Sequence, residues 1–288
     1  MAPIVVVMTQ TVLVLGATGK SGRRLLPRLA SSGISVRAAS RRPGDGHVLF
    51  DWDRPETHRA ALAGADAVYL VTADGVEDTT RQVGPFLQAA ARSGVRRVVV
   101  LSSLLVEFPN TPPDSGRHRL EQQVRDSGLE WTILRPSFIS QNFSEGFLLP
   151  GILAAGVVAS TAGDGKVAPV DADDIAAVAA AALTQPGHQG AAYVLTGPEA
   201  LTFDEAAEII GKASGRPVSH QRITPDEFTA ILNQAGLPSD YAASVVSSQV
   251  AIAEGHGAVV TSAVRDIGAK QPVRFAEYAA AAAAAGVW

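Results

Sequence analysis

The sequence predicts an α/β protein with a Rossmann-type, doubly wound parallel sheet and a smaller C-terminal α/β lobe. Strand and helix patterns alternate through the first half of the chain, which is typical of parallel strands joined by crossover helices. A glycine-rich turn separates the first strand from the first helix. In the second half, short strands are interleaved with several helices, which predicts a separate, smaller lobe.

The segment Thr11 to Gly22, TVLVLGATGKSG, is the most informative part of the chain. A short apolar run stops at Gly16, Gly19 and Gly22, spaced G-x-x-G-x-x-G, and a helical apolar pattern follows. Glycines let the backbone turn sharply and approach a pyrophosphate, whose charge meets the free N–H groups of the helix start. We therefore predict a dinucleotide-binding turn. The alternative is a turn with only a structural role.

The remaining elements follow from periodicity and turn residues. The expected strands of the core are Ser35 to Ser40, Val48 to Phe50, Ala67 to Val71, Arg97 to Leu101 and Trp131 to Leu134. A helix is expected from about Glu77 to Ser93, and an amphipathic helix is expected to bury Leu120 and Val124. Further on we expect strands at Tyr193 to Thr196 and Val218 to Ile223, and helices near Asp173 to Leu183, Phe203 to Ala213, Pro225 to Ala235 and Ser239 to Ala253.

These patterns predict an N-terminal extension at residues 1–10, a cofactor-binding core at 11–150, and a substrate-side lobe at 151–288 that is interleaved with the core. We expect the lobe to pack over the nicotinamide end of the cofactor. The apolar run at 4–8 is too short for a membrane span and lacks the features of a signal peptide. We therefore expect a cytoplasmic protein without a membrane partner.

Composition narrows the chemistry. The chain has 288 residues, a hydrophobic fraction of 47% and no cysteine, so disulfides, thiol nucleophiles and thiolate metal sites are excluded. The formal net charge is -4 and the basic residues form no stripe, which disfavours nucleic-acid binding. We expect a monomer or homodimer that acts on a small-molecule substrate.

Cofactor choice is predicted from the end of the second strand, where the chain offers Ser40, Arg41 and Arg42. Dehydrogenases that prefer NAD usually place an acid there to hold the ribose hydroxyls. An acid would repel a 2′-phosphate, whereas a guanidinium binds it with paired, charge-assisted hydrogen bonds. We therefore predict NADP(H) as the cofactor, with one of the two arginines on the phosphate and the other solvated.

Asp51 lies at the end of the next strand, where it either accepts from the adenine amino group or, like Asp53, caps a turn or helix. The predicted cofactor-binding residues are Gly16, Thr18, Gly19, Lys20, Ser21, Gly22, Arg41, Arg42, Asp51 and Thr72.

Several motifs occur together in the chain: G-A-T-G-K-S-G, the Ser40-Arg41-Arg42 strand end, L-S-S, T-I-L-R-P and D-A-D-D-I. In this combination the chain resembles the atypical short-chain dehydrogenases of the NmrA-like family, from about Thr11 to Thr196 and more weakly to Phe228. The stretch R-P-S-F-I-S-Q-N-F-S-E looks most like the ergot-alkaloid reductases, the festuclavine and agroclavine dehydrogenases, and is similar to the NADPH:quinone reductase branch. The resemblance implies a nicotinamide cofactor and reductase activity.

The resemblance also implies catalytic positions. Short-chain dehydrogenases commonly use a Ser, a Tyr and a Lys, the last two as Y-x-x-x-K, to move a proton to or from the substrate oxygen. Ser102 or Ser103 matches the family's serine. Aligning Glu121 with the glutamate that often follows the motif places Pro113 at the tyrosine position and Arg117 at the lysine position. A phenol can act as a general acid and proline cannot, so we expect no ketone-reducing acid of the usual kind.

Two side chains near this helix start are further catalytic candidates. Arg117 either favours developing negative charge or holds a phosphate, and its alternative is a solvated helix residue. His118 is the next candidate acid because its titration range suits proton transfer near neutral pH. Its alternative is a surface residue.

The predicted substrate wall follows the last large strand, at the sheet edge where ligands of such folds bind. It consists of Phe138, Gln141, Asn142 and Phe143, and the alternative for the two phenylalanines is packing between the lobes. The nearby Asp171, Asp173 and Asp174 precede an alanine-rich helix, so we predict helix capping rather than catalysis. No spacing of His, Asp and Glu indicates a metal site.

Together these observations favour an NADP-dependent reductase of an imine, iminium, quinone or activated alkene, because such acceptors take up hydride without a protein acid. Two alternatives stay open. One is a non-catalytic NADP sensor that controls a protein partner, and the other is an isomerase or epimerase that uses the bound cofactor.

Overall fold

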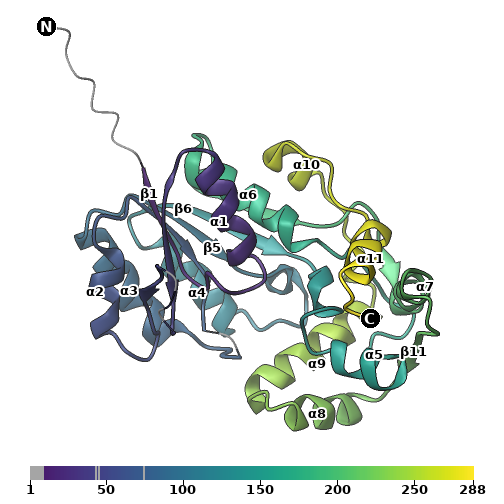
Figure 1. Cartoon of the computed structure of the whole chain (residues 1–288). Helices are drawn as coiled ribbons and strands as arrows, with labels where there is room; N and C mark the ends of the chain where they lie inside the picture. Colours follow the sequence, from purple (N-terminus) through teal and green to yellow (C-terminus); the bar gives the residue numbers. More distant parts are fainter. Residues whose placement is uncertain (1–9, 43, 45, 74) are drawn as a thin grey trace, which may run out of the picture.

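The structure is a computed structural model that describes residues 10–42, 44, 46–73 and 75–288 (Figure 1). The predicted extension at residues 1–10 lies outside the described residues except for Gln10. The side-chain amide of Gln10 donates a hydrogen bond to the carbonyl of Leu183, which ties the start of the described chain to the far end of a core helix.

Within the described residues, seven parallel strands form the central sheet, in the order β3-β2-β1-β4-β5-β6-β9. Their bounds are β1 Thr11–Val14, β2 Ser35–Ser40, β3 Val48–Leu49, β4 Ala67–Leu70, β5 Arg97–Leu101, β6 Glu130–Pro136 and β9 Ala191–Leu195. The order reverses between β1 and β4, which is the switch point where such sheets bind ligands. The predicted Rossmann-type sheet is confirmed, and its last strand comes from the second half of the chain.

Helices cover both faces of the sheet (Figure 1). One face carries α1 Gly22–Ser31, α6 Ala172–Thr184 and α10 Ala263–Gly268, and the other carries α2 Glu56–Leu62, α3 Thr80–Arg92 and α4 Gly116–Arg125. Alternate side chains of β1 serve the two cores: Val12 and Val14 pack toward α1 and α6, and Leu13 packs toward α2 and α3. Because both faces are buried, the strands read as continuous apolar runs.

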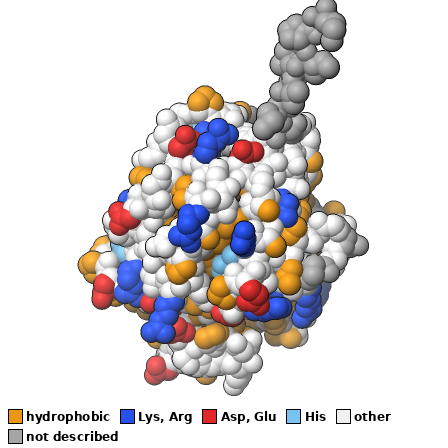
Figure 2. Space-filling model, turned by 90° about the vertical axis from the view of Figure 1, so that its left-hand side faces the viewer, with side chains coloured by type: hydrophobic (Ala, Val, Ile, Leu, Met, Phe, Trp, Pro, Cys, Tyr) orange, Lys and Arg blue, Asp and Glu red, His pale blue; other side chains and the backbone are white. Residues whose placement is uncertain are grey.

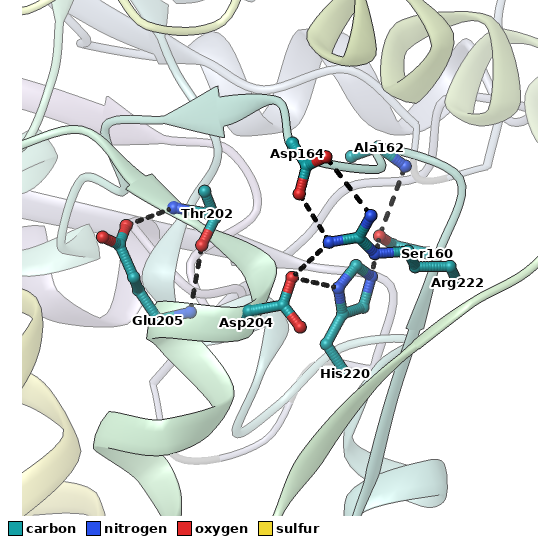
Figure 3. Close-up of polar contacts among 8 residues, drawn as sticks. All are labelled: Ser160, Ala162, Asp164, Thr202, Asp204, Glu205, His220 and Arg222. Carbon is teal, nitrogen blue, oxygen red and sulfur yellow. Dashed lines mark hydrogen bonds and ion pairs between the residues drawn. The ribbon is translucent and has the colours of Figure 1, made fainter.

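The smaller lobe lies beside the carboxyl edge of the sheet (Figure 1). It consists of α5 Leu149–Ala155, β7 Val157–Ser160, β8 Lys166–Val167, β10 Leu201–Thr202, α7 Phe203–Ser214, β11 Ser219–Arg222, α8 Pro225–Gln234, α9 Ser239–Ala253 and α11 Phe275–Ala284. Strand β7 pairs with β11, and β8 pairs with β10. Polar contacts among β7, β11 and the start of α7 join its parts (Figure 3).

Two short 3-10 helices complete the described elements that matter for the site: η1 Leu104–Glu107 follows β5 and η2 Ser140–Asn142 follows β6. On the face drawn in Figure 2, basic and acidic side chains are interspersed. None of the helices in the described part of the chain is long and apolar enough to cross a membrane.

Candidate active site

The glycine loop between β1 and α1 is wound around the carbonyl oxygen of Gly16. Gly16 itself has a φ of +63°, which favours glycine. A Cβ on Gly22 would lie 2.1 Å from the Gly16 oxygen, and a Cβ on Gly19 would lie 3.1 Å from it. Gly16, Thr18 and Gly19 are exposed. The loop therefore closes only without a side chain at Gly22, and its outer surface is open to a ligand.

The start of α1 is suited to an anion. The side chain of Ser21 makes no capping hydrogen bond and instead accepts one from the hydroxyl of Tyr69 at 2.9 Å. Burial raises the pKa of Tyr69 far above its ordinary value, so the phenol keeps its proton for this bond. The first turn of α1 carries no acid. A helix start of this kind, with bare glycine backbone in front of it, fits the pyrophosphate of a dinucleotide.

The glycine loop is joined to the segment that follows β6. Lys20 Nζ donates to Asn142 Oδ1 at 3.0 Å, which brings a predicted cofactor residue against a predicted substrate residue. Glu145 forms ion pairs with Arg23 and Arg24 of α1. Although partial burial opposes ionisation, the hydrogen bonds from these arginines hold the pKa of Glu145 below its ordinary value.

The other predicted cofactor residues lie at neighbouring strand ends. Arg41 and Arg42 are exposed directly after β2, and the Ser40 hydroxyl donates to the Arg42 carbonyl at 2.7 Å. Thr72 is half-buried shortly after β4. The carboxylate of Asp51 accepts from the backbone N–H of Asp53 at 3.1 Å, so it caps a turn in this structure. These groups share the carboxyl edge of the sheet with the glycine loop.

Ser102, at the end of β5, is held by a buried carboxylate. Its hydroxyl donates to Glu121 Oε1 at 2.7 Å. Glu121 is only 1% exposed and also accepts from Arg135 at 2.6 and 2.9 Å and from Arg125 at 2.9 Å. Burial opposes ionisation, but the Arg135 and Ser102 hydrogen bonds hold the pKa of Glu121 below its ordinary value. A hydroxyl has one proton to donate, and that of Ser102 is committed to Glu121.

The sequence prediction missed Arg135, and it used Glu121 only to align the motif. A signal was present, because Glu121 lies between Leu120 and Val124 on the buried side of α4 and has Arg125 four residues later. Ser103 has a local role: its side chain accepts from the backbone N–H of Leu105 at 3.2 Å and caps η1.

The start of α4 borders a cavity of about 330 Å³ between the core and α9. The cavity is lined by Glu77, Leu105, Thr111, Pro112, Ser115, Gly116, Arg117, Ala243, Ser244, Ser247 and Ser248. Arg117 Nη2 is 3.9 Å from Glu77 Oε2. His118 Nδ1 is 2.9 Å from the Ser115 hydroxyl. Residues 109–125, which contain α4, include neither tyrosine nor lysine.

The predicted substrate wall divides into packed and accessible residues. Gln141 is buried; its Nε2 donates to Asp171 at 2.9 Å and its Oε1 accepts from the Ala172 N–H at 2.8 Å. Phe143 is fully buried against Phe138 and other rings. Phe138 and Asn142 keep exposed surface. These two residues are therefore the wall candidates that a substrate can reach in this conformation.

Of the three carboxylates at the start of α6, only Asp171 has the predicted capping role. It accepts from the Asp173 N–H at 2.7 Å, which confirms the capping prediction for this residue. Asp173 lies in the first turn and forms ion pairs with Arg28 and Lys270. Asp174 is fully buried and pairs with Lys270 at 2.6 Å. Searching the described residues finds no group of three His, Asp or Glu side chains that could hold a metal ion.

The parallel sheet, its switch point and the open glycine loop define a dinucleotide-binding protein with a Rossmann-type fold. Residues 16–186 match the NAD(P)H-binding family, and this span is more than half of the chain. The chain belongs to this family and is an NAD(P)H-dependent oxidoreductase of the NmrA-like group that its motifs resemble.

Relatives match along nearly the whole chain. A Bacillus subtilis protein named as the uncharacterised oxidoreductase YesF is 39% identical over 95% of each chain. The (4-alkanoyl-5-oxo-2,5-dihydrofuran-3-yl)methyl phosphate reductase of Streptomyces griseus is also 39% identical, over 93% of this chain and 96% of its own. Agroclavine dehydrogenase of Claviceps fusiformis is 31% identical over 93% of this chain and 96% of its own length. This match confirms the resemblance to ergot-alkaloid reductases.

Among solved structures, the NADPH-dependent quinone oxidoreductase QOR2 of Escherichia coli, complexed with NADPH, is 26% identical. It superposes with a TM-score of 0.80 and covers 94% of this chain and 99% of its own. The similarity extends through the smaller lobe as well as the sheet.

Proposed function

We propose that this protein is an NADPH-dependent reductase that delivers hydride to an activated acceptor: a quinone, an iminium ion or a conjugated alkene. The observation that carries the proposal is the state of the two serines together with the lack of a Tyr and Lys pair in residues 109–125. The Ser102 proton is committed to Glu121, the Ser103 hydroxyl caps η1, and residues 109–125 hold no Tyr and Lys pair. An acceptor that needs no protein acid suits this site.

The chemistry of such acceptors is consistent with the residues present. When bound, the cofactor supplies the hydride. An iminium carbon becomes a neutral amine without further protonation, and a quinone or conjugated carbonyl spreads its negative charge until solvent provides a proton. The named relatives support this class, since they include a dihydrofuranyl methyl phosphate reductase, an azoreductase and a quinone oxidoreductase.

The acceptor class is tested by NADPH oxidation against a simple quinone, a cyclic iminium ion, an enal and an unactivated ketone. General acid catalysis typically contributes about 10²–10⁴-fold, so without it the ketone should be slower by a factor of this order. Rapid ketone reduction that collapses in His118→Ala would instead identify His118 as the acid. Tight NADPH binding with no turnover of any acceptor would favour the NADP sensor.

The preference for NADPH rests on Arg41 and Arg42, which are exposed directly after β2. Replacing both by alanine should weaken NADPH binding by about 1.5–3 kcal/mol, the value of a charge-assisted hydrogen bond, and leave NADH binding unchanged. Arg92 and Arg96, exposed at the opposite edge of the sheet, provide a matched double-alanine control. Equal affinity of the unaltered protein for both cofactors, measured by calorimetry, would refute the assignment.

The glycine loop offers a test of cofactor placement. Gly19→Val should block NADPH binding while leaving a folded protein, because Gly19 is exposed where the pyrophosphate would approach. Gly22→Ala should damage the loop itself, since the new Cβ would lie 2.1 Å from the Gly16 oxygen. Calorimetry with NADPH and thermal melts separate the two effects. Normal binding by Gly19→Val would place the cofactor elsewhere.

A further inference from the structure

We propose that the cavity between α4 and α9 binds an anionic group of the substrate, a phosphate, sulfonate or carboxylate, with Arg117 as its cation. The inference rests on the reductase function proposed above and specifies the substrate class. Among the described residues that line the cavity, Arg117 is the one cation and Glu77 the one acid. The volume of about 330 Å³ accommodates such a group together with part of the molecule that carries it.

Two ion pairs join the start of α4 to the segment before α3, and the distance between the charged atoms differs between them. Arg119 Nη2 lies 2.8 Å from Asp78 Oδ2, a well-formed pair on the exposed side. Arg117 Nη2 lies 3.9 Å from Glu77 Oε2, and no hydrogen bond joins them. Within the described structure, Arg117 Nε and Glu77 Oε2 are buried without any hydrogen-bond partner. Buried polar groups in folded proteins are normally paired, so the unpaired Arg117 Nε indicates a missing acceptor. Glu77 Oε2 can only accept, so an anion would pair with Arg117 and not with Glu77.

The backbone holds Arg117 in this place. Gly116, the first residue of α4, packs directly on the segment before α3, and a Cβ there would lie 2.1 Å from the Glu77 carbonyl oxygen. The Arg117 side chain as a whole is 23% exposed, and it contributes to the lining of the cavity. A planar guanidinium with free donors binds an anionic oxygen group with paired hydrogen bonds.

Hydroxyl groups line the wall opposite Arg117. On α9, Ser247 and Ser248 follow Ser244 by three and four residues, so each of them lies on the same face of the helix as Ser244. Ser248 Oγ donates to the Val245 carbonyl at 2.6 Å, and Ser247 Oγ accepts from Asn110 at 3.3 Å. The Ser244 hydroxyl and the Ser247 proton are therefore the donors that this wall offers to the oxygens of a phosphate or sulfonate. Ser115 also lines the cavity beside Arg117, but its hydroxyl is engaged by the backbone N–H and Nδ1 of His118.

The cavity also lies at the edge of the sheet where the reaction would occur. Glu77 belongs to the segment after β4, and Leu105 and Thr111 belong to the segment after β5. Both strands end at the edge that carries the glycine loop. An acceptor whose anionic end occupies the cavity would therefore direct its remaining part toward the cofactor side of the core.

The test compares 1,2-naphthoquinone with its anionic 4-sulfonate as hydride acceptors from NADPH. In Arg117→Gln, kcat/KM for the sulfonate should fall by about tenfold or more, mainly through KM, and this fall should be clearly larger than that for the neutral quinone. Arg119→Gln is the matched control, because it removes the same charge from the same helix, and it should leave both values unchanged. Glu77→Gln should raise kcat/KM for the sulfonate, because the carboxylate that competes for Arg117 is removed.

A binding measurement keeps this inference separate from the reductase proposal. Phenyl phosphate is titrated by calorimetry into the full chain with saturating NADP⁺, which occupies the cofactor's own phosphate sites. We expect binding that Arg117→Gln abolishes and Arg119→Gln preserves. If neither quinone is reduced but this binding is seen, the reductase proposal fails and the anion site stands. The anion site is refuted if Arg117→Gln lowers kcat/KM for both quinones by the same factor, or if the variant still binds phenyl phosphate.

Discussion

Two polar networks in this protein are each built on a serine hydroxyl and a titratable side chain. Under the sheet edge, Ser102 donates to Glu121, which two arginines neutralise. In the smaller lobe, Ser160 Oγ is 2.7 Å from His220 Nε2, and His220 Nδ1 is 3.1 Å from Asp204 (Figure 3). In the first network the charged carboxylate of Glu121 is buried. In the second network the Ser160–His220 hydrogen bond is buried, and the charged groups of Asp204 and Arg222 are exposed.

The exposures explain this difference. Glu121 is 1% exposed, so its charge depends on Arg135 and Arg125. Asp204 and Arg222 are 50% and 54% exposed, and solvent screens them. The Ser160–His220–Asp204 order is that of a nucleophilic triad, but Ser160 is fully buried and presents no surface to a substrate. Both networks therefore have a structural role, but loss of a charged residue should change stability more in the first network than in the second.

The largest effect is expected for Arg135→Ala. It leaves Glu121 buried with one arginine fewer, and loss of a partner from a buried pair should lower the free energy of unfolding by about 3 kcal/mol. Urea denaturation measures the change. Arg222→Ala, which removes a solvent-screened guanidinium, is the control and should change stability little. If the two substitutions lowered the free energy of unfolding equally, the proposed difference between the buried and the exposed network would be wrong.

His220→Ala is expected to come second. The buried Ser160 hydroxyl loses its histidine partner and keeps only the bond that it accepts from the Ala162 N–H, which should cost about 1–3 kcal/mol of unfolding free energy. In the double variant with Ser160→Ala, the hydroxyl that lacks its histidine partner is gone, so the combined loss should be smaller than the sum of the single losses. Additive losses in urea denaturation would show that the two side chains are not coupled.

The sequence predicted the fold where local patterns decide it. The strands at Ser35–Ser40 and Arg97–Leu101 and the helix at Ser239–Ala253 have the predicted bounds, because turn residues and periodicity mark their ends. The predicted strand at Tyr193 to Thr196 was found at Ala191–Leu195, paired with β6. Its place as the seventh strand of the sheet depends on long-range pairing that no local pattern encodes.

The candidate site was predictable in part for the same reason. The glycine loop is a local motif, and its geometry is readable from spacing alone. The partner of Ser102 is 19 residues away and that of Lys20 is 122 residues away, so neither contact has a sequence signature. The Glu77–Arg117 pair likewise joins two segments that meet only because Gly116 lets them pack closely.

Ser102→Ala tests the sheet network with a smaller change. The loss of a hydrogen bond to a charged group should cost about 1.5 kcal/mol of stability. With a quinone or iminium acceptor, kcat should stay nearly unchanged, because no oxyanion has to be held by this hydroxyl. Ser103→Ala is the matched control, since it removes only the cap of η1. A large fall in kcat without loss of stability would make Ser102 a catalytic residue.

The smallest effect concerns pH in the lobe network. The hydrogen bond from His220, followed by that from Arg222, holds the pKa of Asp204 below its ordinary value of 3.8. A carboxyl with a lowered pKa in the folded state stabilises the protein above its unfolded pKa, and this contribution disappears as pH falls through the folded pKa. Asp204→Asn should therefore cost less than about 1 kcal/mol near neutral pH, as expected for an exposed pair. As the pH falls below 3.8, the difference between the variant and the unaltered protein should shrink, and it should vanish only below the lowered pKa of the folded state, as measured by urea denaturation across that range. A difference that does not shrink as the pH falls below 3.8 would mean that Asp204 acts through packing and not through its charge.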